Sequence, residues 1–169
     1  INRIEVWVTN KTGEVNNTRN ILAFMDLAEN RKDNIYNDIA DFQAINDTDF
    51  PYNNANNLYK SISDDQGIRQ LKTISDVMGQ YEDDGFNLGR DYEKLENARL
   101  LSSRDYTLNA QLGYISLNSA LNSDEVLAVA FEYVDATGQT RQVGEFSTDT
   151  EVEHPKVLLV KMLKGTNLT

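Results

Sequence analysis

Alternating hydrophobic and polar positions mark the start of the chain as a strand. Residues 3–9 place Ile4, Val6 and Val8 at every second position. A period of two with β-branched side chains predicts a strand with one buried face. Trp7 falls on the other face, so we expect that face to be covered in part. Residues 20–27 fit a strand or a helix, and a glycine turn at hairpin distance from the first strand favours a strand.

The second half of the chain returns to the same alternation. The strongest pattern covers residues 125–134, and the Asp135-Ala-Thr-Gly138 turn leads from it into a partner strand at 140–146. Weaker patterns predict further strands at 92–100 and 113–118. Residues 157–163 also favour a strand, with a helix as the alternative. We expect the strands to form an antiparallel sheet or a sandwich.

The middle of the chain has a different pattern. Residues 30–65 are polar and rich in Asn, which favours turns and caps, so we expect an irregular segment with at most short helices. Residues 67–81 repeat apolar side chains at helical spacing and predict an amphipathic helix of about four turns. We therefore expect a helical insertion over about 54–81, with four side chains packed on the sheet: Leu58, Ile62, Leu71 and Met78. The predicted fold class is a strand-dominated α+β domain over residues 1–169.

Composition narrows the class of protein. The chain of 169 residues has 16 basic and 27 acidic side chains, a net charge of -11, which disfavours binding to nucleic acid. No apolar run approaches the ~18 residues of a membrane-spanning helix. The absence of cysteine excludes a disulfide scaffold and thiolate zinc sites. Both ends of the sequence suggest cuts through a longer polypeptide, so we expect a soluble domain of a larger protein.

Candidate chemistry is sparse. His154 is the only histidine and precedes Pro155, which predicts an extended loop with no catalytic partner. The acidic runs 82–84 and 64–65 do not match a calcium-binding loop. With 27 acidic residues, some pair always suits glycoside hydrolysis, so that signal carries no weight. We expect no catalytic residue, no metal site and no cofactor, and therefore no enzyme.

Three longer stretches resemble a known family. The first joins RIEVWVTNKTG to TRNILAFMDL, within residues 3–27. The second joins ENARLLSSRDYTLNAQLGYISLN to DEVLAVAFEY and QVGEFS, within residues 96–147. The third is LLVKMLKGTNL at residues 158–168. These stretches are similar to an internal segment of the SprA family, also called Sov, whereas residues 30–91 match nothing in it.

The resemblance implies a function and a location. The SprA family comprises giant outer-membrane β-barrel translocons of gliding motility and type IX secretion in Bacteroidota. It implies a non-catalytic structural or interaction domain, whose partners are other parts of the same protein and secretion-system components, with secreted cargo as a further option. Membrane contact would come only through the parent barrel. We expect the domain at the cell outer membrane, on the extracellular rather than the periplasmic side.

Two other functions stay open on the sequence alone. One is a carbohydrate-binding β-sandwich module of a cell-surface protein, which would use a row of exposed aromatic side chains. The aromatic candidates are Trp7, Tyr36, Tyr52, Tyr59 and Tyr81. The other is a glycan-degrading enzyme, which would place two carboxylates about 5–10 Å apart in a cleft.

Overall fold

The computed structural model describes residues 1–13, 15–31, 33, 35–37, 50–109 and 114–166. Its strands are β1 (Arg3–Val8), β2 (Thr18–Phe24), β3 (Tyr92–Leu100), β4 (Tyr106–Asn109), β5 (Tyr114–Leu117), β6 (Leu127–Val134), β7 (Thr140–Val143) and β8 (Leu158–Lys164). The α-helices are α1 (Leu58–Ser63) and α2 (Ile74–Glu82), both between β2 and β3. Short 3₁₀ helices are η2 (Asn53–Ala55), η3 (Gln66–Arg69), η4 (Leu71–Thr73) and η5 (Thr150–Val152). The predicted α+β class is confirmed, and the helices lie in the centre of the chain as expected.

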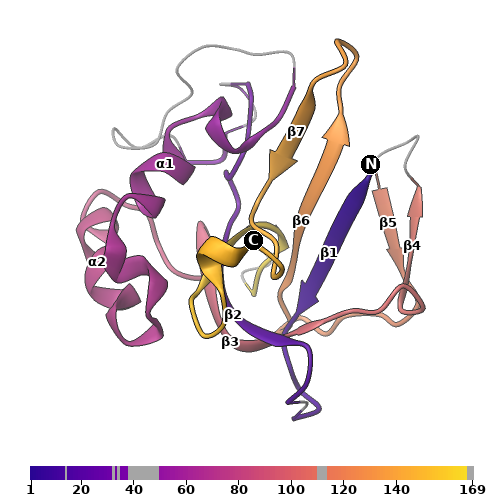
Figure 1. The fold of residues 1–169 in the computed structure, drawn as a ribbon. Helices are drawn as coiled ribbons and strands as arrows, with labels where there is room; N and C mark the ends of the chain where they lie inside the picture. Colours follow the sequence, from indigo (N-terminus) through magenta and orange to yellow (C-terminus); the bar gives the residue numbers. More distant parts are fainter. Residues whose placement is uncertain (14, 32, 34, 38–49, 110–113, 167–169) are drawn as a thin grey trace.

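The main sheet closes on itself. Within the described residues its strand order is β1-β3-β2-β8-β6-β7, and β1 also pairs with β6 along Arg3–Val8. Strands β1, β3, β2, β8 and β6 therefore form a ring, which we call the closed sheet. Strand β7 lies beside β6, outside this ring (Figure 1). The predicted antiparallel pairing holds for the other strand pairs of the main sheet, whereas β2 and β8 are parallel. The strand expected at 113–118 is not part of this sheet, because β5 pairs with β4 in a separate two-stranded sheet. The sandwich alternative is not confirmed.

Two irregularities interrupt the strand register of the closed sheet. The register between β2 and β3 shifts between Arg19 and Ile21, where Asn97 has a φ of 53° and its N–H donates to Asn20 Oδ1 at 2.9 Å. A second shift separates Leu127 from Ala128 where β6 pairs with β8. Such bulges increase local twist and bend the strand.

Neighbouring residues along the main strands point to opposite faces of the sheet and pack into different apolar clusters. The interior of the closed sheet contains Trp7, which is fully buried, so the face expected to be partly covered is wholly enclosed. The helices lie against one outer face and the β4–β5 hairpin lies on the opposite side of the molecule (Figure 1). The helix-side cluster includes Leu22, Phe24, Leu58, Ile62, Ile68, Met78 and Leu159. The hairpin-side cluster includes Val6, Val8, Leu127 and Val129, with Tyr106 and Ile115 packed against them.

The predicted continuous helix over 67–81 is wrong. Gln70 is extended, with φ -117° and ψ 129°, and divides η3 from η4 and α2. The Asp65 side chain accepts from Gly67 N–H at 3.0 Å and caps the start of η3. The Arg69 carbonyl accepts from Val157 N–H at 3.0 Å, so it pairs outside the helical segment where that segment breaks. Leu71 is consequently only partly buried, while Leu58, Ile62 and Met78 are fully buried as predicted.

Smaller differences concern the strands. No strand is predicted from the sequence at β4, because its four residues, Tyr106–Asn109, are too few to give a clear alternation. The strand predicted at 140–146 ends at Val143, since Gly144 has a φ of 77° and a Cβ there would lie 3.0 Å from Ala130 Cβ. Residue 113 of the predicted strand 113–118 and residues 38–49 of the predicted irregular segment lie outside the described residues.

Candidate functional site

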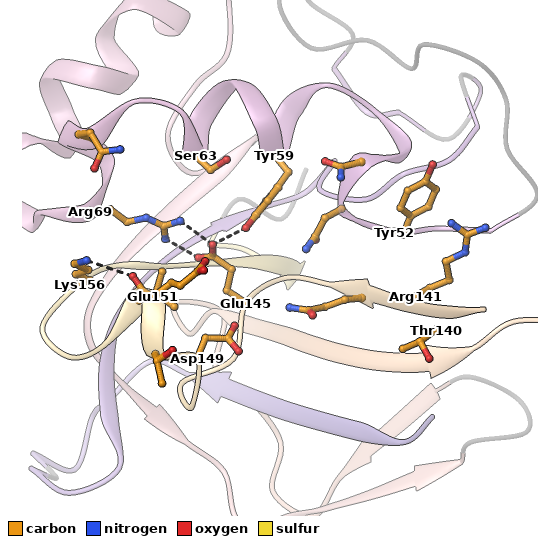
Figure 2. Close-up of a pocket in the computed structure, with 16 residues that line it drawn as sticks. Tyr52, Tyr59, Ser63, Arg69, Thr140, Arg141, Glu145, Asp149, Glu151 and Lys156 are labelled. Carbon is orange, nitrogen blue, oxygen red and sulfur yellow. Dashed lines mark hydrogen bonds and ion pairs between the residues drawn. The ribbon is translucent and has the colours of Figure 1, made fainter. Parts of the chain in front are cut away.

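A polar cleft of about 750 Å³ lies between the helical insertion and the β7 side of the sheet (Figure 2). One wall comes from η2, α1 and η3, another from β7, and the third from the segment around η5. Polar and charged side chains predominate among the residues that line it. They are Tyr52, Asn53, Asn54, Tyr59, Ser63, Gln66, Arg69, Thr140, Arg141, Gln142, Glu145, Asp149, Thr150, Glu151, Val152 and Lys156.

Glu145 is at the centre of the cleft floor and is only 4% exposed. Arg69 binds it through both guanidinium nitrogens, at 2.6 Å to Oε1 and 2.7 Å to Oε2. The Tyr59 hydroxyl donates to Oε2 at 2.6 Å, and the Leu159 N–H donates to Oε1 at 2.8 Å. Each carboxylate oxygen therefore accepts two hydrogen bonds, and the ion pair connects α1, η3 and β8.

Burial and neighbouring charges determine the protonation states of Tyr59 and Arg69. Burial raises the pKa of the Tyr59 hydroxyl, and the neighbouring Glu145 charge raises it further. Burial alone would lower the pKa of Arg69, but its hydrogen bonds to Glu145 outweigh this and the net pKa is raised. Tyr59 thus stays neutral and Arg69 stays charged over the physiological range. A fully bonded carboxylate with these partners is suited to holding the fold rather than to proton transfer.

The rim beside β7 carries a second polar cluster. The Arg141 guanidinium lies 4.6 Å from the centroid of the Tyr52 ring, and its Nε donates to Asp135 Oδ2 at 2.8 Å. Hydrogen bonds from the Thr137 hydroxyl and then from Arg141 hold the pKa of Asp135 well below its usual range, against an opposing effect of burial. These contacts fix the turn between β6 and β7, and so the position of the β7 edge.

Asn53 joins the helical insertion to the end of β7. Its Oδ1 accepts from Gly144 N–H at 2.7 Å, and its Nδ2 donates to the Gly144 carbonyl at 3.1 Å. The side-chain amide thus binds both backbone groups of one residue, as a neighbouring strand would do.

The residues considered from the sequence lie mostly elsewhere. His154 is exposed in a turn beside a separate cavity of about 420 Å³, and residues 82–84 are exposed at the end of α2. Within the described ranges, no group of three or more His, Asp or Glu side chains is arranged to hold a metal ion. Among the five aromatic candidates, Trp7 and Tyr81 are buried, Tyr36 is exposed, and only Tyr52 and Tyr59 line the cleft.

Sequence reasoning missed the residues that define the cleft. Asn53, Arg69, Arg141 and Glu145 were not singled out. A signal existed for Glu145, a charged residue between Gly144 and Phe146 in a segment predicted to be a buried strand. Its partner Arg69 is 76 positions away, so no local pattern identifies the pair.

Comparisons with known proteins add no family. No protein-family model matches the chain, and no curated protein matches it. In the part of the chain that the structure describes, none of the helices is both long and apolar enough to cross a membrane.

Proposed function

We propose that this chain is a non-catalytic structural and interaction domain of an outer-membrane translocon of the SprA/Sov type, which acts in type IX secretion and gliding motility. The supporting resemblance rests on the sequence stretches quoted above. We place the domain on the extracellular side of the outer membrane, with contacts to the rest of the parent protein and to secretion-system components.

The observation that carries the proposal is where those stretches lie in the fold. They contain all of β1, β2, β4, β5 and β8 and most of β3 and β6, so they account for most of the closed sheet. Residues 30–91, which carry no resemblance, supply the helices that cover one outer face. A sheet shared with a family and an added helical layer is the expected arrangement for a lineage-specific insertion into a family domain.

The chemistry of the cleft also supports a non-catalytic role. Its central carboxylate is occupied by Arg69, Tyr59 and a backbone N–H, and so is not placed to act as a nucleophile or a base. Glycan binding is the competing function, because Tyr52 and Tyr59 line the same polar cleft.

Deletion in the parent gene tests the proposal. Removal of the codons for residues 1–169 is expected to reduce export of a C-terminally tagged cargo, measured in the culture medium. Assembly of the parent protein is followed in the same cells by heat-modifiable electrophoresis of outer membranes. The control, made by the same editing, is Val15→Ala, since Val15 is 85% exposed. Normal export from a correctly assembled protein would contradict the proposal, and glycan-array binding by the isolated chain would then favour the carbohydrate-binding function.

A second experiment tests the location. An epitope tag inserted after Ala136, in the exposed turn between β6 and β7, is expected to bind antibody on intact cells. Labelling only after the outer membrane is permeabilised would place the domain on the periplasmic side and contradict that part of the proposal.

A further inference from the structure

Among the strands that the structure describes, β7 pairs on one side only. In the described residues, β6 is its single neighbour in the sheet, with Val134 opposite Thr140, Tyr133 opposite Arg141, Glu132 opposite Gln142 and Phe131 opposite Val143. Its other edge faces the polar cleft, whose lining includes Thr140, Arg141 and Gln142 (Figure 2).

The hairpin register tells which backbone groups are on that edge. Asp135 N–H donates to the Gln139 carbonyl at 2.8 Å, so this pair is hydrogen-bonded. In an antiparallel ladder, hydrogen-bonded and non-hydrogen-bonded pairs alternate. Arg141 therefore exchanges hydrogen bonds with Tyr133, whereas the N–H and C=O groups of Thr140 and Gln142 point away from β6.

The next residue whose backbone groups point outward, Gly144, is already bound by a side-chain amide. Gly144 follows Gln142 by two positions, and Asn53 binds both its N–H and its carbonyl. The Asn53 amide thus occupies one position of a strand that would lie beside β7. Among the described residues, none donates to or accepts from the outward-pointing backbone groups of Thr140 and Gln142.

We infer that the β7 edge binds an extended peptide segment of a partner protein, which continues the pairing that Asn53 begins. The cleft volume of about 750 Å³ falls within the ~300–1,000 Å³ of typical ligand pockets, so it accommodates a few residues of such a segment. Addition of a strand to an exposed edge provides main-chain hydrogen bonds for affinity. Because the cleft is lined mainly by polar side chains, the bound segment carries polar rather than apolar residues.

A second copy of the chain fits this edge less well. Two copies each carry a net charge of -11, so they repel, and antiparallel pairing of two β7 strands would bring their Arg141 side chains together. The short edge and its central charged residue are features that limit pairing between copies. This inference does not depend on the translocon function proposed above.

Proline substitution tests the edge directly. Proline lacks an N–H, and on a free strand edge it removes no bond of the existing ladder. Gln142→Pro therefore removes an outward donor, while Gln142→Ala is the matched control. Both variants lose the same side-chain hydrogen bond from Gln142 Nε2 to the Gly144 carbonyl.

The probe is a random 12-residue peptide library displayed on phage and selected on the 169-residue chain. The best peptide is synthesised, and its binding is measured by fluorescence anisotropy. We expect Gln142→Pro to weaken binding at least tenfold and Gln142→Ala to change it less than twofold. N-methylation of alternate amides in the peptide is expected to weaken binding at least tenfold as well.

Amide hydrogen exchange provides a readout that does not require a variant. We expect the peptide to slow exchange at Thr140 and Gln142, while Arg141 is protected with or without it. Failure to select a peptide that competes for this edge would overturn the inference. So would binding that neither Gln142→Pro nor N-methylation weakens, a dimer that Gln142→Pro dissociates, or binding of glycans alone.

Discussion

At the scale of single residues, the buried ion pair in the cleft floor determines how the helical insertion is attached. Removal of one partner leaves the other charged and buried, which costs about 3–5 kcal/mol. Arg69→Ala is therefore expected to lower the free energy of unfolding by about this amount, because Glu145 is 4% exposed and loses two of its four donors. Urea unfolding followed by circular dichroism measures the change. Lys72→Ala, at an exposed position of η4, is the control and should leave stability within about 0.5 kcal/mol of the parent.

Asn53 offers a second test at this scale. Asn53→Ala removes two hydrogen bonds to Gly144, each with a net contribution of about 1 kcal/mol, so a loss of about 2 kcal/mol is expected. Asn53→Asp keeps the acceptor but places a carboxylate oxygen against the Gly144 carbonyl, so it should recover little of that loss. The neighbouring Asn54 is exposed, and Asn54→Ala serves as the control in the same urea titration. Equal stability of the Asn53 and Asn54 variants would show that the contact contributes nothing.

The asparagine cluster shows how far residue-level prediction reaches. Asn favours turns and caps, and Asn56 makes a turn before α1, since its Oδ1 accepts from Leu58 N–H at 3.0 Å. The N-cap residue of α1, Asn57, makes no side-chain capping bond. The Asn56 side chain also donates to the Asp26 carbonyl at 2.8 Å, and Asn53 reaches Gly144, 91 positions away. Local propensity predicts that asparagine lies in turns and at helix ends rather than inside helices. It does not predict which distant backbone group an asparagine binds.

At the scale of elements, the break at Gln70 changes which side chain anchors the insertion. Ile68 is fully buried, while Leu71 is only partly buried. Ile68→Ala should therefore cost about 2–5 kcal/mol, whereas Leu71→Ala should cost only about 1 kcal/mol. Thermal unfolding of the two variants gives the comparison. A larger loss for Leu71→Ala would support the continuous helix over 67–81 instead.

The β6–β7 turn predicts a pH dependence. The lowered pKa of Asp135 means that its carboxylate stays ionised in the folded chain at a pH where the unfolded chain, with a pKa of about 3.9, takes up a proton. The stabilisation is therefore present above about pH 4 and is lost as the pH falls towards the folded pKa. Asp135→Asn should lower the melting temperature at pH 7 and approach the parent in acid. Thr137→Val removes the hydroxyl that donates to Asp135 Oδ1. It should also lower the melting temperature at pH 7, by less than Asp135→Asn does.

Secondary-structure elements were predictable where the pattern of hydrophobic and polar positions is sufficient to locate them. Alternation located β1, β6 and the β6–β7 hairpin, because a strand with distinct faces needs a period of two. The parallel pair of β2 and β8 was not predictable, since these strands are separated by most of the chain. The register shift between β2 and β3 near Asn97 was not predictable either, because no sequence motif indicates the positive φ of that residue. The cleft follows from closure and from the break at Gln70, so it too was missed.

At the scale of the whole molecule, the closed sheet and the helical layer share the same strands. Ile21 and Leu158 face the interior beside Trp7, while the adjacent Leu22 and Leu159 pack against the helices. Loss of the helical layer would therefore expose one face of the strands that enclose Trp7. Apolar clusters built on opposite faces of the same strands should unfold together, as single cooperative domains do.

Trp7 makes this cooperativity measurable. It is the only tryptophan in the sequence and is fully buried inside the closed sheet, so its fluorescence follows the sheet. Circular dichroism at 222 nm follows mainly α1 and α2. We expect the two signals to give one transition with the same midpoint in urea. Ile68→Ala, in the helical layer, should move both midpoints equally, and Val15→Ala should move neither. Separate midpoints, or a shift of the dichroism signal alone, would mean that the insertion unfolds on its own and that residues 1–169 are not one cooperative domain.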